Sequence, residues 1–209
     1  MGGVILDDSE PEIKRQQILF DIVKDYIPNL TMERLRKAWM DSSGTFGSMR
    51  IVALRELCKD LPESEEIEKQ YNELCQVDYI GMSKVRPEVK EVLSKLSTRY
   101  NLGLMANQNA KAMEHLVNAG VLEFFSHQKM SHHVGLEKPN PEFFKSILGD
   151  TGAKAEESVI IDDNWFRGCL PAMKMGMKSI LYERDIIPSP SEAQPDARVK
   201  NLTELLGIF

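Results

Sequence analysis

The stretch Ser158-Val159-Ile160-Ile161-Asp162-Asp163-Asn164 decides the fold, because an apolar run ends in two adjacent carboxylates. Residues 158–161 are typical of a buried strand in a parallel sheet. Two carboxylates in a crevice of low dielectric repel each other unless a positive charge neutralises them. Mg2+ suits such a site, because it binds one or two carboxylates together with water and phosphate oxygens. Helix capping by Asp163 or Asn164 is the alternative, but it accounts for only one carboxylate. The pattern therefore favours a metal at Asp162 and Asp163.

The rest of the second half of the chain alternates between short apolar strands and helices. We predict strands at 102–105, shortly after Phe125, at 158–161 and at 178–182, and helices over 87–95, 109–119, 141–148 and 165–175. This alternation predicts parallel βαβ units, and hence an α/β fold with an open, doubly wound, mainly parallel sheet. Ligands of such sheets bind at the carboxyl ends of the strands.

Residues 12–80 follow a different pattern, with apolar residues three or four positions apart and charged residues between them. This spacing predicts a small helical bundle. Thr31 is the expected N-cap of one helix, and two more helices are expected over 49–59 and 63–77. The chain thus divides into a short opening segment of residues 1–11, a helical part of residues 12–80 and an α/β part of residues 81–209.

Polar residues follow the predicted strand at 102–105 and lead straight into a helix. Ala106 and Asn107 stand at this junction. Backbone N–H groups at a helix N-terminus, together with the Asn107 amide, would bind an anion. The alternative is that Asn107 or Asn109 only caps the helix, which taken alone is the more common role.

Lys138 stands in an unusual local sequence, Lys138-Pro139-Asn140-Pro141. Pro139 favours an extended backbone at Lys138, which directs an otherwise flexible side chain. Asn140 is a suitable N-cap, and Pro141 fits the first helical position. Lys138 is therefore a candidate cation for a phosphate, although an isolated lysine is more often a solvated surface residue.

Composition narrows the class of protein. A hydrophobic content of 42% and a net charge of −6 are typical of a soluble globular protein, and the acidic balance disfavours nucleic acid as a partner. No apolar run approaches the roughly 20 residues that span a bilayer, so we expect no membrane insertion and a cytoplasmic location. The sequence indicates neither a particular substrate nor an oligomeric state.

In this order, the strand followed by Asn107, the Lys-Pro-x-Pro segment at Lys138 and the strand ending in Asp162-Asp163 resemble the haloacid dehalogenase-like hydrolase superfamily, phosphatase branch. The resemblance implies that residues 12–80 are a helical cap domain and residues 81–209 the core domain. It implies that Lys138 steadies a phosphoryl group and its aspartate partner, and that Asp163, with Asp162 beside it, holds Mg2+. Family members usually have Ser or Thr at the position of Ala106, where Asn107 is the candidate substitute for phosphate binding.

Chemistry in this family starts from an aspartate at the end of the first strand, which attacks phosphorus, and a carboxylate two residues later transfers protons. The opening Met1-Gly2-Gly3-Val4-Ile5-Leu6 is similar to the residues that follow this aspartate, with Gly2 in the place of the second carboxylate. The nucleophile would then precede Met1, either because an internal Met was taken as the start or because the strand was lost. A third register would make Asp7 the nucleophile and Ser9 the acid and base, but Ser9 is unsuited to proton transfer.

Three functions follow from these observations. The first is a Mg2+-dependent phosphatase of small phosphomonoesters that forms an aspartyl-phosphate, although we expect the chain beginning at Met1 to be inactive or nearly so. The second is a non-catalytic phosphate-binding or interaction protein on the same fold. The third is a metal-independent haloacid dehalogenase, which the adjacent Asp162 and Asp163 disfavour, because an anionic substrate without a cation would be repelled by two negative charges.

Overall fold

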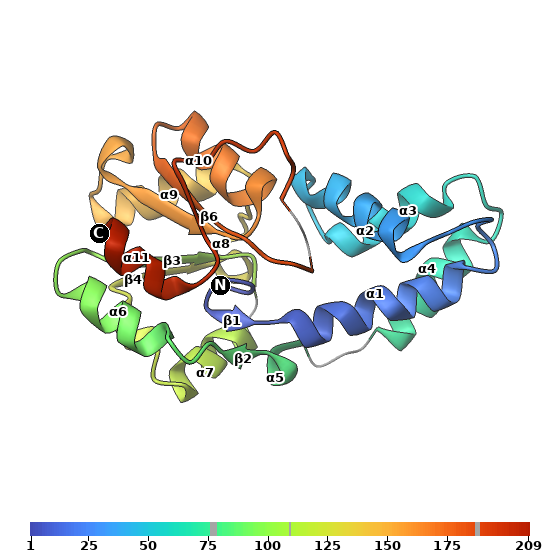
Figure 1. Ribbon diagram of the computed structural model, residues 1–209, viewed down its shortest axis with the longest axis horizontal. Coiled ribbons are helices and arrows are strands. Elements are labelled where there is room, and N and C mark those ends of the chain that lie inside the picture. The colour runs from blue at the N-terminus through green and yellow to red at the C-terminus, as the bar shows by residue number, and fades with distance from the viewer. Residues whose placement is uncertain (76–78, 109, 187–188) are drawn as a thin grey trace.

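The computed structural model describes residues 1–75, 79–108, 110–186 and 189–209. A helical half and an α/β half lie side by side, and helix α1 (Ser9–Val23) runs from one to the other (Figure 1). The N-terminus lies inside the α/β half, close to the strands, whereas the C-terminus lies on its outer side.

The helical half is built from α1, α2 (Met32–Asp41), α3 (Met49–Cys58) and α4 (Ser64–Leu74), with a 3-10 turn at Ser42–Gly44 after α2. These helices bury a hydrophobic cluster of their own, whose largest side chains include Leu19, Trp39, Leu54 and Tyr71. The predicted N-cap is confirmed, because Thr31 Oγ1 accepts the N–H of Arg34 at 3.1 Å. The predicted helix over 63–77 is observed as α4, and its last two predicted residues lie outside the described part of the chain.

The α/β half confirms the predicted fold class. Strands β3 (Gly103–Ala106) and β4 (His127–Met130) are parallel, as are β5 (Val159–Asp162), β6 (Lys178–Tyr182) and β7 (Ala197–Val199). The helices of this half are α5 (Tyr79–Met82), α6 (Val89–Ser97), α7 (Ala110–Asn118), α8 (Ser131–Val134), α9 (Pro141–Thr151), α10 (Leu170–Lys174) and α11 (Leu205–Ile208). Asn109, the predicted start of the helix observed as α7, lies outside the described residues.

The N-terminal segment does not form the parallel strand that the third register requires. Residues 3–5 form a turn, in which the Met1 carbonyl accepts the N–H groups of Ile5 and Leu6. Strand β1 is only Leu6–Asp7, and it pairs antiparallel with β2 (Lys84–Val85). Val4, Ile5 and Leu6 are buried in the same core cluster as the apolar residues of β3 and β6, so the turn packs into the core of the sheet region.

The segment after β5 departs from the predicted helix over 165–175. It starts as a π-helical turn at Trp165–Cys169 and continues as the α-helix α10. Gly168 lies against the carboxylate of Asp162, where a Cβ atom would come within 2.2 Å of Asp162 Cγ. The wider π turn therefore accommodates a backbone that passes directly over the end of β5.

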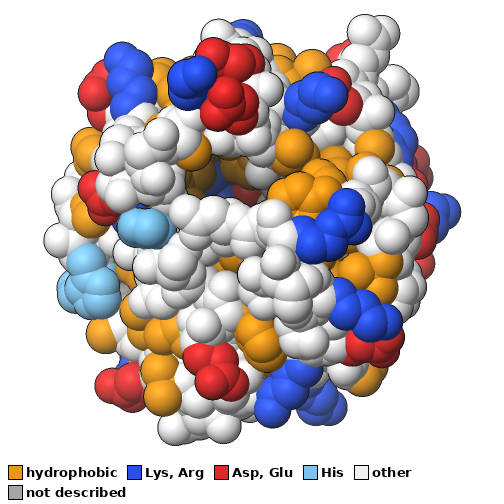
Figure 2. All heavy atoms as spheres, turned by 90° about the vertical axis from the view of Figure 1, so that its left-hand side faces the viewer, with side chains coloured by type: hydrophobic (Ala, Val, Ile, Leu, Met, Phe, Trp, Pro, Cys, Tyr) orange, Lys and Arg blue, Asp and Glu red, His pale blue; other side chains and the backbone are white. Residues whose placement is uncertain are grey.

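The surface carries charges of both signs. On the face of the α/β half that is turned away from the helical half, basic and acidic side chains are interspersed (Figure 2). Within the described residues, no helix has both the length and the apolar character needed to cross a bilayer.

Candidate functional site

A buried ion pair lies at the carboxyl end of β5. Lys138 precedes α9, and Asp162 is the last residue of β5. Lys138 Nζ lies 2.5 Å from Asp162 Oδ2, and the two side chains are only 9% and 6% exposed. Burial raises the pKa of Asp162, but the Lys138 ammonium, the Met1 amine and the Asn164 N–H outweigh it and leave this pKa below its usual range. The sequence predicts that these two residues lie close together, and the structure places them so. The alternative, that Lys138 is a solvated surface residue, is wrong because its side chain is buried.

Asn107 holds the backbone of Lys138. Its Nδ2 donates to the Lys138 carbonyl at 2.9 Å, and its Oδ1 accepts the Lys138 N–H at 2.8 Å. The side-chain amide is thus used in a two-bond clamp between the segments that follow β3 and precede α9. Ala106 is 2% exposed and packs in the core, so it offers the site no polar side-chain atom. Asn140 caps α9 through Glu142, as the sequence predicts.

Asp163 is bound to Arg184 rather than to Lys138. Arg184 Nη1 lies 2.8 Å from Asp163 Oδ2, and Nη2 donates to Asp8 Oδ1. Arg184 stands two residues after β6, and its side chain is 5% exposed. Burial lowers the pKa of this guanidinium, but Asp163 and Asp8 outweigh the burial and raise it. The pKa of Asp8 is raised to about 6, by burial first and by the nearby Asp163 and Glu12, although Arg184 opposes the shift.

The α-amino group of Met1 is buried in this cluster. Its pKa is lowered, mainly by burial and next by the positive charge of Lys138, whereas Asp162, Asp163 and Asp8 oppose the shift. Gly3 has a φ of +76°, and a Cβ atom on it would lie 2.0 Å from Asp163 Oδ2. The backbone of residues 1–3 therefore runs directly past the acidic pair, between Lys138 and Arg184.

The donor set beside the acidic pair does not match what Mg2+ requires. Asp162 uses Oδ2 on Lys138 and Oδ1 on the N–H of Asn164 at 2.9 Å. Asp163 uses Oδ2 on Arg184. Within the described ranges, no three His, Cys, Asp or Glu side chains are arranged to hold a metal ion. The chain itself neutralises both carboxylates, so the charge argument for a metal at Asp162 and Asp163 loses its basis.

Hydrogen bonds to Arg167 and Glu137 fasten the helical half over these strand ends. Arg167, in the π turn after β5, donates to the carbonyl oxygens of Ser43, Thr45 and Gly47 at 2.8, 2.6 and 2.6 Å. The Gly47 N–H in turn donates to Glu137 Oε1 at 2.7 Å. A charged guanidinium that bonds to three carbonyls holds a loop tightly. The loop of residues 43–47 is thus attached to the segments that carry Lys138 and Asp162.

A cleft of about 730 Å3 lies between the two halves. The helical half contributes Glu12, Arg15 and Arg50 to its lining, and the α/β half contributes Asn107 and His132 among others. Arg50 lies in the first turn of α3, which faces the cleft. The pKa of Glu12 is raised by burial, against the opposing charges of Arg50 and Arg15.

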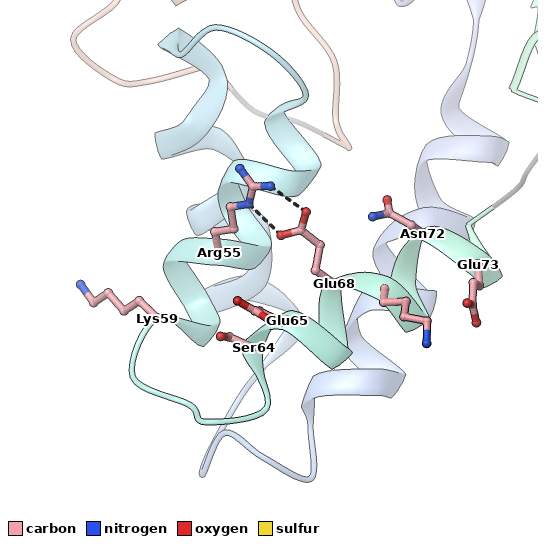
Figure 3. A pocket seen from close by; sticks show the side chains of 8 residues that line it. Arg55, Lys59, Ser64, Glu65, Glu68, Asn72 and Glu73 are labelled. Atoms are coloured by element: carbon pink, nitrogen blue, oxygen red, sulfur yellow. Dashed lines mark hydrogen bonds and ion pairs between the residues drawn. The ribbon is translucent and has the colours of Figure 1, made fainter.

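A second hollow, of about 770 Å3, lies on the helical half between α3 and α4. Arg55 and Glu68 face each other across it at 2.7 Å (Figure 3). Its other charged side chains include Lys59, Lys69 and Glu73, which are exposed. It contains none of the strand-end residues described above, so we do not assign the chemistry of the protein to it.

Comparison with known sequences decides the family. Residues 9–182 match the sequence model described as haloacid dehalogenase-like hydrolase. The chain belongs to this family. Among solved structures, a conserved haloacid dehalogenase-like protein from Agrobacterium tumefaciens shares its fold with a TM-score of 0.73 and 18% identity, over 99% of this chain and 93% of that one.

Curated relatives within the haloacid dehalogenase-like hydrolases include phosphatases. Phosphoserine phosphatase from Thermus thermophilus is 35% identical over 92 residues, which are 44% of this chain and 37% of that protein. Glyceraldehyde 3-phosphate phosphatase from Methanothermobacter thermautotrophicus is 32% identical over 117 residues, or 55% of this chain and 50% of that protein. The chain therefore spans half or less of the length of these two relatives.

Three features of the site escaped the sequence reasoning. Arg184 lies two residues beyond a strand, and only the position of that strand next to β5 indicates that it can reach Asp163. Arg167 resembles any charged residue of an amphipathic helix. The Met1 amine enters the site because of the turn at residues 3–5, for which the two glycines at positions 2 and 3 were an available signal.

Proposed function

We propose that this haloacid dehalogenase-like hydrolase provides the site of a phosphatase that acts on small phosphomonoesters through an aspartyl-phosphate. The observation that supports this best is the buried Lys138–Asp162 pair, because Asn107, which holds the backbone of Lys138, lines the cleft between the two halves. The phosphatases among its relatives support the same reaction class.

Each residue has a role that its contacts support. The Lys138 ammonium binds a phosphoryl oxygen and neutralises charge that develops during transfer. Asp162 orients this ammonium through the ion pair, and Asn107 fixes the backbone from which it projects. Ala106 contributes only backbone groups. The cap, for which we propose residues 12–80 with the core at 81–209, closes the cleft through the loop of residues 43–47 and excludes water from the reaction.

The position of Met1 suggests where the nucleophile enters. The carboxylates of Asp8, Asp162 and Asp163 are all bound to basic side chains, whereas the Met1 amine is buried beside Lys138. A residue joined to this amine would place its side chain at the same point. We propose that an aspartate in that position would act as the nucleophile.

Two further assignments remain predictions. A role for Mg2+ at Asp162 and Asp163, and with it a catalytic role for Asp163, is what the family resemblance implies; because the donor set at these carboxylates does not fit the ion, we derive no step through it. The cytoplasmic location follows from composition alone.

Turnover of p-nitrophenyl phosphate tests the proposal. Three forms are compared in the presence and absence of Mg2+: the chain beginning at Met1, and two chains lengthened by a short apolar strand that ends in Asp or in Asn directly before Met1. We expect turnover only in the form with Asp, about 10³-fold or more above the form with Asn. Equal activity in all three forms would refute the proposed nucleophile.

The alternatives give different results in the same experiment. A phosphate-binding protein without catalysis would bind inorganic phosphate in calorimetry, but would release no p-nitrophenol even in the form with Asp. A dehalogenase would release chloride from 2-chloropropionate without a metal ion. The pairing of Asp162 and Asp163 with basic side chains removes the charge argument against this third function, so chloride release is measured directly.

A further inference from the structure

Arg184 occupies a position that joins three parts of the core. It follows β6 by two residues, and its guanidinium reaches Asp163 after β5 and Asp8 just before α1. The side chains of Arg184 and Asp8 are each 5% exposed, and that of Asp163 is 20% exposed. A residue remote from every predicted motif thus holds the second member of the acidic pair.

A guanidinium can replace a divalent cation at such a point. It stays charged at every accessible pH, and its planar fork presents donors to two carboxylates at once. Arg184 uses both terminal nitrogens in this way, one on Asp163 and the other on Asp8. Two carboxylates that would otherwise repel each other are thereby held together without a metal ion.

The space beside Asp163 is also filled. The hypothetical Cβ of Gly3 lies 2.0 Å from Asp163 Oδ2 and 2.8 Å from Arg184 Nη1. Backbone therefore closes one side of the carboxylate and the guanidinium another. Mg2+ needs near-octahedral geometry and usually keeps several water molecules, which this arrangement does not accommodate.

We infer that Arg184 is a built-in substitute for the divalent cation at Asp163, so that a metal ion binds there only when Arg184 is displaced. This inference rests on the proposed phosphatase site at Asp162 and Asp163, but its test measures metal binding and does not require turnover. It has two consequences: the wild-type chain binds divalent ions weakly at Asp163, and removal of the guanidinium creates affinity for them.

Mn2+ binding to the full chain, followed by the electron paramagnetic resonance signal of the free ion, tests the inference. We expect no Asp163-dependent binding in the wild type below about 1 mM, and about tenfold or greater tightening in Arg184→Met. Adding Asp163→Asn to Arg184→Met should remove the gained affinity. Arg198→Met is the matched control, because Arg198 also pairs with a carboxylate, Glu183, but is 37% exposed. It should behave as the wild type.

Thermal unfolding keeps the test decisive if Arg184→Met folds poorly. Loss of the guanidinium removes the ion pairs that Arg184 makes with Asp8 and Asp163, so the variant should be less stable than the wild type. Mn2+ should restore this stability in a concentration-dependent way. Asp8→Asn combined with Arg184→Met relieves part of the repulsion and gives a second folded background. Wild-type binding tighter than about 0.1 mM that disappears in Asp163→Asn would overturn the inference, as would Arg184 variants with no gain in affinity.

Discussion

Breaking the Lys138–Asp162 pair by removing one partner should destabilise the protein strongly. Lys138→Met leaves the Asp162 carboxylate, 6% exposed, without its ammonium partner. A buried charge that loses its partner costs about 3–5 kcal/mol. For a chain of this size 1 kcal/mol shifts the melting temperature by about 2–4 °C, so we expect a fall of about 6–20 °C.

The double variant Lys138→Met with Asp162→Asn separates charge loss from packing. Asn keeps an oxygen for the N–H of Asn164, which Asp162 accepts at 2.9 Å. The double variant should therefore be more stable than Lys138→Met alone, with a coupling free energy of about 1–3 kcal/mol in the thermodynamic cycle.

Lys145→Met is the matched control, because Lys145 pairs with Glu142 at 2.7 Å while both side chains are 61% exposed. It should change the free energy of unfolding by no more than about 0.5 kcal/mol. Urea and thermal denaturation followed by circular dichroism are measured for the wild type, Lys138→Met, the double variant, Lys145→Met, and Asp162→Asn, which completes the cycle. If Lys138→Met costs no more than Lys145→Met, the buried pair does not hold the strand ends together.

The Lys138–Asp162 pair also makes the free energy of unfolding depend on pH, in a direction that the structure predicts. Because the pKa of Asp162 is lowered in the folded protein, its stabilising contribution is complete above the pKa of the unfolded chain and is lost as the pH falls through the lower folded value. The stability difference between the wild type and the double variant should therefore shrink below about pH 4. A difference that grows in acid would contradict the assignment of the charges.

Three further predictions concern the loop of residues 43–47, the π turn and the thiols. Arg167→Met should speed hydrogen exchange of the Gly47 amide by about tenfold or more, as measured by mass spectrometry, because Arg167 donates three charge-assisted bonds to this loop and the loss of even one costs about 1.5 kcal/mol; an unchanged rate would refute the fastening of the loop. Gly168→Ala should lower the free energy of unfolding by about 1–3 kcal/mol in urea denaturation, since its methyl group would collide with Asp162; a neutral effect would mean that the π turn does not pass over β5. Native protein should react quickly with a thiol reagent only at half-buried Cys75, because burial raises the pKa of the other two thiols, Cys58 and Cys169; fast labelling of all three thiols would contradict this packing.

Local chemistry made several elements predictable. Thr31 and Asn140 cap their helices because a side-chain oxygen meets a free N–H group within three residues, which needs no tertiary information. Asp162 lies at the carboxyl end of β5, where the rule for parallel sheets places ligands, and Asn107, directly after β3, holds Lys138 beside it. The rule predicts the edge, but it does not say which basic side chain pairs with which carboxylate.

Other features depend on contacts between distant segments. Strands β1 and β2 have two residues each, too few for a periodic pattern. The π turn at residues 165–169 exists because Gly168 passes over Asp162, so tertiary packing overrides the helical periodicity. Arg184 reaches Asp163 only because β5 and β6 are neighbours. For the same reason the charge argument for a metal ion fails, since it counted the carboxylates without the arginine.

The most direct test of the central claim is the intact-protein and peptide mass of a quenched reaction with p-nitrophenyl phosphate. The protein is the chain lengthened by a strand that ends in Asp before Met1. We predict a phosphoryl adduct on that aspartate, which disappears in Lys138→Met and when the added residue is Asn. An adduct on Asp7, Asp8 or Asp163, or turnover without Lys138, would contradict the claim that the phosphoryl group is transferred beside the Lys138–Asp162 pair.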